Sequence, residues 1–303
     1  MAEQARATLW LFRAFGQAFP HHAVDALVEY FAFFGGMEAW EGLDFLGGVE
    51  AAIEREIVGQ IEEASERIAP SYLMEEPYRS VLVAIARGDG KIFNVFRRAR
   101  LSEALGGQIL NELVEQEVVR IEASRELPPR RRHGEQLPRH LRGYRIQSKV
   151  RFVRPFYRFW FGFVAPYIGQ LEQGDGERFW RYFRAHRDRI GSLVFEHLSN
   201  ALLEETCASD DPILHTGSWW DRRSEYDVLA HTRSGRTILG ECKYTGRSIT
   251  KGELTKLQDK AAQTGLRVDT YALFSRSGFS RELSGMASER LLLFGIEDFG
   301  RLL

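Results

Sequence analysis

"EYDVLAHTRSGRTILGECKYTG", residues 225–246, reads as two apolar strands joined by the polar turn HTRSGRT. Charged side chains interrupt this apolar pattern, because Asp227 lies on the first strand and Glu241 and Lys243 lie on the second. Burial of a charge costs free energy, and buried charges persist mainly where they are paired or bind a metal. The hairpin therefore predicts both the centre of a sheet and a functional site.

The sequence on either side of the hairpin predicts a mixed sheet covered by helices. A helical pattern runs from about residue 187 to 205, and another runs over 250–265 and ends at Gly265. The strand patterns DTYALFS and RLLLFGI follow, and short helical segments alternate with them. Residues 187–303 are therefore predicted to form an α+β or α/β domain with helices on both faces of its sheet.

The region before this domain reads as helical, and we divide it into three parts. Residues 1–75 carry a helical pattern at 22–34 and an acidic amphipathic pattern that predicts one helix at 49–68. Residues 76–148 have the layout of a winged helix, and residues 149–186 form an aromatic and basic connecting segment. Most aromatic side chains of this segment are predicted to form a core between two domains, with arginines on its rim. Stacking on nucleic-acid bases is the alternative.

The winged-helix layout consists of three helical patterns and two strands around a basic loop. The helical patterns cover 77–90, 91–100 and 101–116, and the strands cover 118–124 and 144–147. Helix-turn-helix relatives place the third helix in the major groove and the wing on the backbone. The third helix here carries Glu103, Glu112 and Glu115, which would repel phosphate. A winged helix that packs against protein therefore remains an alternative.

Charge is unevenly distributed along a chain of net charge −1. Residues 35–67 hold nine acidic and two basic residues, whereas residues 128–158 hold ten Lys or Arg and one acid. The basic block predicts contact with nucleic-acid phosphates, although such blocks are often only a solvated face. The predicted nucleic-acid-binding residues are Arg130, Arg131, Arg132, Lys149 and, on the helix after the hairpin, Lys256.

Strand alternation places Glu241 and Lys243 on one face of the hairpin, and strand pairing brings Asp227 close to Glu241. Two carboxylates form a hard-oxygen site suited to Mg²⁺ or Mn²⁺, since Mg²⁺ commonly takes one or two protein carboxylates and keeps several waters. Such a metal lowers the pKa of bound water and stabilises phosphate oxyanions. Lys243 would orient the attacking water or neutralise charge in the transition state.

The motif EYD…GECK resembles the PD-(D/E)XK nuclease superfamily, in which Asp227 and Glu241 match the metal-binding pair and Lys243 the catalytic lysine. A glutamate on the first helix of that superfamily often completes the metal site, and Glu196 matches it. Helical periodicity, however, places Glu196 nearly opposite the inward stripe of its helix. Superfamily members often place a Gln or Lys at the position of Lys256, although a helix-surface lysine is the commoner explanation.

Residues 140–303 also resemble a domain of unknown function at the C-terminus of archaeal-type P-loop ATPases, which has stand-alone relatives in bacteria. The winged helix resembles the module that precedes this domain, and EYFAFFGG resembles the end of the ATPase lid. No G-x4-G-K-[ST] motif occurs in the sequence, so the resemblance is to the tail of these proteins without the motor. It implies a separately encoded ATPase as a possible partner.

Composition restricts the class of protein. Two cysteines, Cys207 and Cys242, cannot form a disulfide framework and fit a reducing cytoplasm. No apolar run of 18 residues and no signal-peptide pattern occurs, so neither a membrane span nor export is expected. The leading hypothesis is a Mg²⁺-dependent DNA endonuclease. The alternatives are a non-catalytic DNA-binding or regulatory protein with a nuclease-like fold, and a partner of a separate ATPase.

Overall fold

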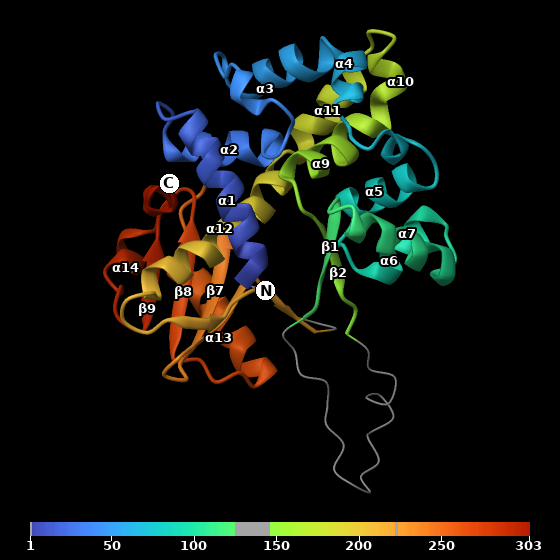
Figure 1. Ribbon diagram of the computed structural model, residues 1–303. Helices are drawn as coiled ribbons and strands as arrows, with labels where there is room; N and C mark the ends of the chain where they lie inside the picture. Colours follow the sequence, from blue (N-terminus) through green and yellow to red (C-terminus); the bar gives the residue numbers. More distant parts are fainter. Residues whose placement is uncertain (1, 125–145, 222–223) are drawn as a thin grey trace, which may run out of the picture.

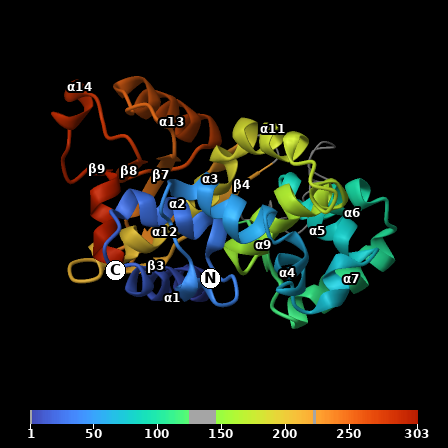
Figure 2. The same ribbon diagram turned by 90° about the horizontal axis from the view of Figure 1, so that it is seen from above.

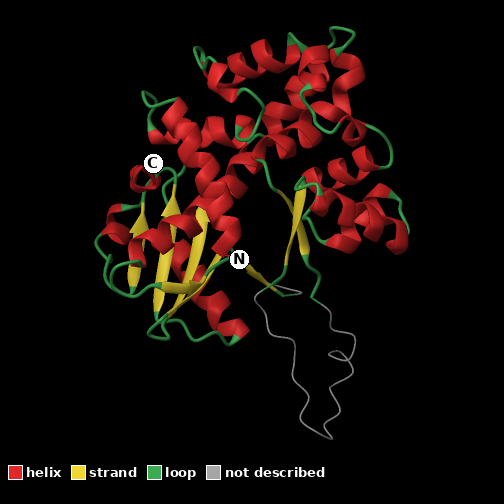
Figure 3. Cartoon of the chain, in the orientation of Figure 1, coloured by secondary structure: helices red, strands yellow, loops and turns green. Residues whose placement is uncertain are grey.

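A computed structural model describes residues 2–124, 146–221 and 224–303 (Figure 1). Helices make up most of the chain that precedes the C-terminal sheet. A separate two-stranded ribbon lies between this sheet and part of the helical region (Figure 3). The predicted fold class, a helical N-terminal region followed by a mixed sheet flanked by helices, is confirmed. Among the described residues, no helix is long and apolar enough to cross a membrane.

The N-terminal region is helical, as predicted, but its second amphipathic pattern does not form one helix. The elements are α1 (Ala2–Ala18), α2 (Val24–Phe34), η1 (Trp40–Gly42), α3 (Gly48–Ile53), η2 (Glu54–Val58), α4 (Ile61–Glu66) and η3 (Ser71–Met74). The single helix predicted over 49–68 is wrong because a π turn, η2, follows α3 and the backbone at Gln60 leaves helical geometry.

The described residues of 78–124 and 146–152 form three helices and a two-stranded antiparallel ribbon. The elements are α5 (Tyr78–Arg87), α6 (Ile92–Ala99), α7 (Glu103–Glu115), β1 (Val119–Glu122) and β2 (Lys149–Phe152). Helix α7 begins after Ser102, whose hydroxyl accepts a hydrogen bond from the Leu105 amide. The return strand pairs Phe152 with Val119 and therefore lies beyond the predicted 144–147, of which residues 146 and 147 are described and are not strand. Val150 and Phe152, two residues apart on this strand, are both buried in the core.

The aromatic connecting segment is a core, as predicted. Its elements are α9 (Pro155–Phe159), η4 (Trp160–Val164), η5 (Ala165–Tyr167), α10 (Ile168–Leu171) and α11 (Glu177–His186). Phe159 is fully buried and packs edge-on against Phe33 of α2, with ring centroids 5.3 Å apart. Trp160 is also fully buried, so these rings are not available to stack on bases.

The C-terminal sheet has five strands in the order β3-β6-β7-β8-β9. Strands β4 and β5 form a separate short hairpin. The elements of this C-terminal region are α12 (Asp188–Cys207), β3 (Ile213–His215), β4 (Trp219–Trp220), β5 (Glu225–Tyr226), β6 (Val228–Thr232), β7 (Thr237–Lys243), α13 (Lys251–Thr264), β8 (Thr270–Ser275), α14 (Arg281–Ser284), β9 (Leu291–Phe294) and η6 (Ile296–Leu302). Strands β6 and β7 are antiparallel, whereas β7, β8 and β9 run parallel.

Helices cover both faces of this sheet (Figure 2). Helices α1 and α12 lie on one face, where Phe274 and Phe294 join the large hydrophobic core. Helix α13 lies on the other face, where Leu254 packs into a smaller cluster with Leu239 and Leu273. Because both faces are buried, a charged side chain on β7 can reach solvent only near the end of the strand.

Candidate functional site

The structure brings Asp227, Glu241 and Lys243 together at one end of the β6–β7 pair. Val228 pairs with Gly240, so the preceding residue, Asp227, lies beside Glu241. Asp227 Oδ2 accepts a hydrogen bond of 2.8 Å from the amide of Cys242. Lys243 Nζ lies 2.6 Å from Glu241 Oε1. The pairing that alternation predicts from sequence is therefore present in the fold.

Helix α12 holds the segment that carries Asp227. The side-chain amide of Asn200 donates to the carbonyls of Glu196, at 2.8 Å, and Asp227, at 3.2 Å. Thr216 donates to the side-chain oxygen of Asn200 at 2.6 Å, and both residues are buried. Sequence analysis missed Asn200, although an amide side chain within the apolar run of a helix is the signal that marks such a contact.

The charges at this site strongly affect one another. Burial raises the pKa of Asp227 well above its ordinary value, and the carboxylates of Glu196 and Glu241 raise it further. For Lys243, burial lowers the pKa, but Glu241 and Asp227 outweigh this effect and the pKa is raised overall. Lys243 is therefore a stable ammonium ion, held next to a pair of carboxylates that repel each other.

Glu196 links this site to a set of buried arginines. Burial raises the pKa of Glu196 to about 7, while Arg151 of β2 and Arg158 of α9 oppose the increase. Burial, together with Arg151, lowers the pKa of Arg158 to about 10. The expectation that arginines of the connecting segment lie on its rim is therefore wrong for Arg158, whose Nη1 is buried. Glu196 is placed between positive charge on one side and Asp227 on the other.

The donor set of the site fits a hard divalent cation. Asp227 and Glu241 provide two carboxylates, and one oxygen of each is engaged by Cys242 or Lys243. Two carboxylates are within the number that Mg²⁺ commonly takes from protein. Within the described residues, however, no group of three or more His, Cys, Asp or Glu side chains forms a possible metal site. Glu196, predicted as a further ligand, therefore does not complete a three-carboxylate cluster, and its strongest charged neighbours are Arg151 and Arg158.

The predicted nucleic-acid-binding residues have different environments. Arg130, Arg131 and Arg132 lie outside the described residues. Lys256 is exposed on α13 and pairs with Glu253 at 2.6 Å. Lys149 is only 2% exposed, pairs with Glu225, and lies 4.4 Å from the ring centroid of Trp220. Its prediction as a phosphate contact is corrected, because an ammonium ion enclosed in this way does not face a ligand.

The contacts of Lys149 with Trp220 and Glu225 form a clamp between the β1–β2 ribbon and the β4–β5 hairpin, which precedes Asp227. The indole of Trp220 donates to the carbonyl of Gln147 at 2.9 Å, and the Trp220 amide donates to the Ser124 hydroxyl at 3.1 Å. Glu225, the partner of Lys149, lies two residues before Asp227. The ends of β1 and β2 are therefore tied to the chain that carries the carboxylate site.

This clamp predicts that two lysine substitutions differ in their effect on stability. Lys149→Ala should lower the free energy of unfolding by about 1–3 kcal/mol, because it leaves Glu225 without its partner and removes packing on Trp220. Lys256→Ala, the matched control on an exposed surface, should change it by less than about 0.5 kcal/mol. Urea denaturation of both variants measures the difference. Equal stabilities would contradict the structural role of Lys149.

Part of the chain matches a known protein family. Residues 160–257 match the family described as "Archaea bacterial proteins of unknown function". The matched range extends from η4 into α13 and includes Glu196, Asp227, Glu241 and Lys243. No curated protein and no solved structure matches the chain. The match therefore covers the carboxylate site and names no activity for it.

Proposed function

We propose that the protein is a Mg²⁺- or Mn²⁺-dependent nuclease that hydrolyses phosphodiester bonds in DNA. The observation that carries the proposal is the carboxylate pair Asp227 and Glu241 with the Lys243 ammonium beside it, at the end of a buried strand. The resemblance of EYD…GECK to PD-(D/E)XK nucleases supports the same assignment. The mixed sheet, in which β6 and β7 are antiparallel and β7 and β8 are parallel, agrees with the fold class that this resemblance implies.

The chain's own residues would prepare the site in three ways. Asp227 and Glu241 would hold the cation, which when bound lowers the pKa of water and stabilises phosphate oxyanions. The amide of Cys242 orients the Asp227 carboxylate. Lys243, whose pKa is raised, would stabilise negative charge that develops on the phosphate and would not serve as a proton acceptor.

Solvent can reach one side of the site, as a polymeric substrate requires. The Glu241 side chain is 20% exposed and the Lys243 side chain 32% exposed, whereas Asp227 lies deeper. The six arginines between residues 128 and 145 support DNA as the polymer, because clustered Lys and Arg bind phosphates without sequence preference.

Cleavage assays with metal present and absent test the proposal. The wild-type protein should cleave linear duplex or single-stranded DNA with Mg²⁺ or Mn²⁺, and EDTA should abolish cleavage. Glu241→Gln should reduce the rate by at least about a hundredfold, and calorimetry should show weaker Mn²⁺ binding to this variant. Glu289→Gln, a matched change at an exposed position, should have no effect on either quantity.

Two results would contradict the proposal. Salt-dependent DNA binding that needs no metal and leads to no cleavage would favour the non-catalytic DNA-binding alternative. Cleavage that is equally fast in wild-type protein and in folded Glu241→Gln would remove the carboxylate pair from the reaction. Circular dichroism of each variant would establish that it is folded.

A further inference from the structure

A groove with a volume of about 520 Å³ lies between α5 and the η5 segment, away from the carboxylate site. Three arginines line it: Arg79 and Arg87 from α5, and Arg98 from α6. Glu76 is the one acid among its lining residues. The groove therefore has an excess of positive charge.

Main-chain carbonyl groups hold all three guanidinium groups. Arg79 Nη2 donates to Ala165 at 2.6 Å, and Arg87 Nε donates to Gly162 at 2.8 Å. Arg98 Nη1 donates to the carbonyl of Arg87 at 3.3 Å. None of the three forms an ion pair with a residue that the structure describes. Neutral carbonyls orient the arginines but leave their charge uncompensated.

Arg87 has a donor that no described residue satisfies. Its guanidinium carbon lies 4.4 Å from the ring centroid of Tyr182 and 5.5 Å from that of Tyr167, so the group is stacked in place. Its Nη2 atom is buried and has no hydrogen-bond partner among the described residues. A buried charged donor without a partner is costly, and an anion seated in the groove would offset the charge of the guanidinium group.

We propose that the groove formed by Arg79, Arg87 and Arg98 binds a phosphate group. Guanidinium groups form forked, charge-assisted hydrogen bonds that match the tetrahedral oxygens of phosphate. The phosphate belongs either to a nucleic-acid backbone or to a small phosphate-containing molecule. The site is distinct from the carboxylate pair and does not depend on nuclease activity.

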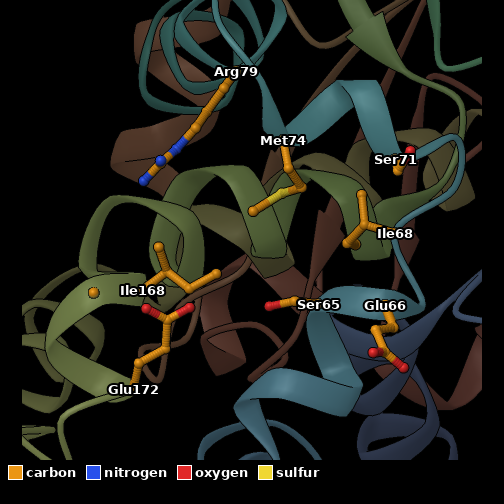
Figure 4. A pocket seen from close by; sticks show the side chains of 9 residues that line it. Ser65, Glu66, Ile68, Ser71, Met74, Arg79, Ile168 and Glu172 are labelled. Carbon is orange, nitrogen blue, oxygen red and sulfur yellow. The ribbon is translucent and has the colours of Figure 1, made fainter.

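Arg79 also lines a second hollow, which has a volume of about 670 Å³ (Figure 4). Ile68, Met74 and Ile168 form its apolar part, and Glu66 and Glu172 also line it. Two carboxylates disfavour an anion there. The phosphate is therefore confined to the side of Arg79 that carries Arg87 and Arg98.

Calorimetric titration of the full chain with inorganic phosphate tests this site. Arg98→Gln should weaken binding about tenfold, because one charge-assisted contact is lost. Arg87→Gln should have at least as large an effect, and glutamine retains an amide donor for Gly162. Arg97→Gln is the matched control, since Arg97 is exposed on α6 and does not line the groove.

A second titration with duplex DNA at several salt concentrations identifies the source of the phosphate. If the nucleic-acid backbone supplies it, Arg98→Gln should weaken DNA binding and lower the salt dependence by about one phosphate contact. Phosphate binding that Arg98→Gln weakens, without an effect on DNA, would identify a small phosphate-containing ligand. If Arg98→Gln behaves as Arg97→Gln does in both titrations, the proposal is wrong. Arg98 is exposed, so this variant decides the result even if Arg87→Gln does not fold.

Discussion

Asp227→Asn is expected to reduce metal-dependent DNA cleavage by at least about a hundredfold and, in the absence of metal, to raise the unfolding temperature. Both effects have one cause. The carboxylate that would bind the cation is largely removed from solvent and is repelled by Glu196 and Glu241, and these effects raise its pKa well above the ordinary value. Asparagine removes the charge but retains an oxygen that accepts the Cys242 amide hydrogen bond.

The stability difference should depend on pH with a definite sign. The pKa of Asp227 is higher in the folded chain than in the unfolded one, so its ionisation opposes folding. This cost is absent below the unfolded value near 4 and increases as pH rises above it. Glu196 adds a cost of the same sign as pH rises from about 4.5 toward its folded pKa of about 7. Asp227→Asn should therefore match the wild-type protein at acidic pH and exceed its stability at pH 8.

Thermal unfolding in EDTA between pH 4 and pH 8, with parallel cleavage assays, measures both effects. Addition of Mg²⁺ should stabilise the wild-type protein by mass action and leave Asp227→Asn unchanged. Asp269→Asn is the matched control, because Asp269 is exposed and accepts a hydrogen bond from Thr237 at the opposite end of β7. A wild-type protein more stable than Asp227→Asn at pH 8 without metal would contradict the repulsion.

The placement of Asp227 beside Glu241 and Lys243 was predictable from the sequence, because strand periodicity and pairing are local properties of a short hairpin. The burial of Lys149 was not predictable, because its environment depends on Trp220 and Glu225, which lie more than 70 residues further along the chain. The same limit applies to the charged neighbours of Glu196. Helical periodicity places Glu196 nearly opposite the inward stripe of α12, but the arginines beside it come from β2 and α9. Sequence thus predicts which face a residue occupies, whereas its charged neighbours depend on how distant elements pack.

The helical region shows a second limit of local patterns. The apolar spacing at 49–68 is compatible with one helix, and its amphipathic character is retained in α3 and α4. The π turn between them and the non-helical backbone at Gln60 interrupt the α-helix. The π turn covers only the five residues Glu54–Val58, and such single turns occur inside otherwise α-helical stretches, so the apolar pattern alone does not reveal it.

Lys243→Met should reduce cleavage by about 10²–10³-fold while metal binding is retained. Methionine has a similar length and no charge, so the change removes electrostatic stabilisation of the phosphate. It also frees the Glu241 oxygen that Lys243 engages at 2.6 Å, and a freed carboxylate binds a cation at least as well. Lys251→Met provides the control, because Lys251 is exposed and pairs with Glu282 at the start of α13.

The pH dependence of cleavage separates two roles for Lys243. Glu241 and Asp227 raise the pKa of Lys243, so its side chain remains cationic even when the pH reaches the ordinary pKa of a lysine. A lysine that acts through its charge should support cleavage up to at least about pH 10. A lysine that accepts a proton would instead need a lowered pKa and would give a rate that rises near neutrality. If Lys243→Met lost metal affinity along with cleavage, the Glu241–Lys243 pair would serve to build the cation site, and the phosphate would need another source of positive charge.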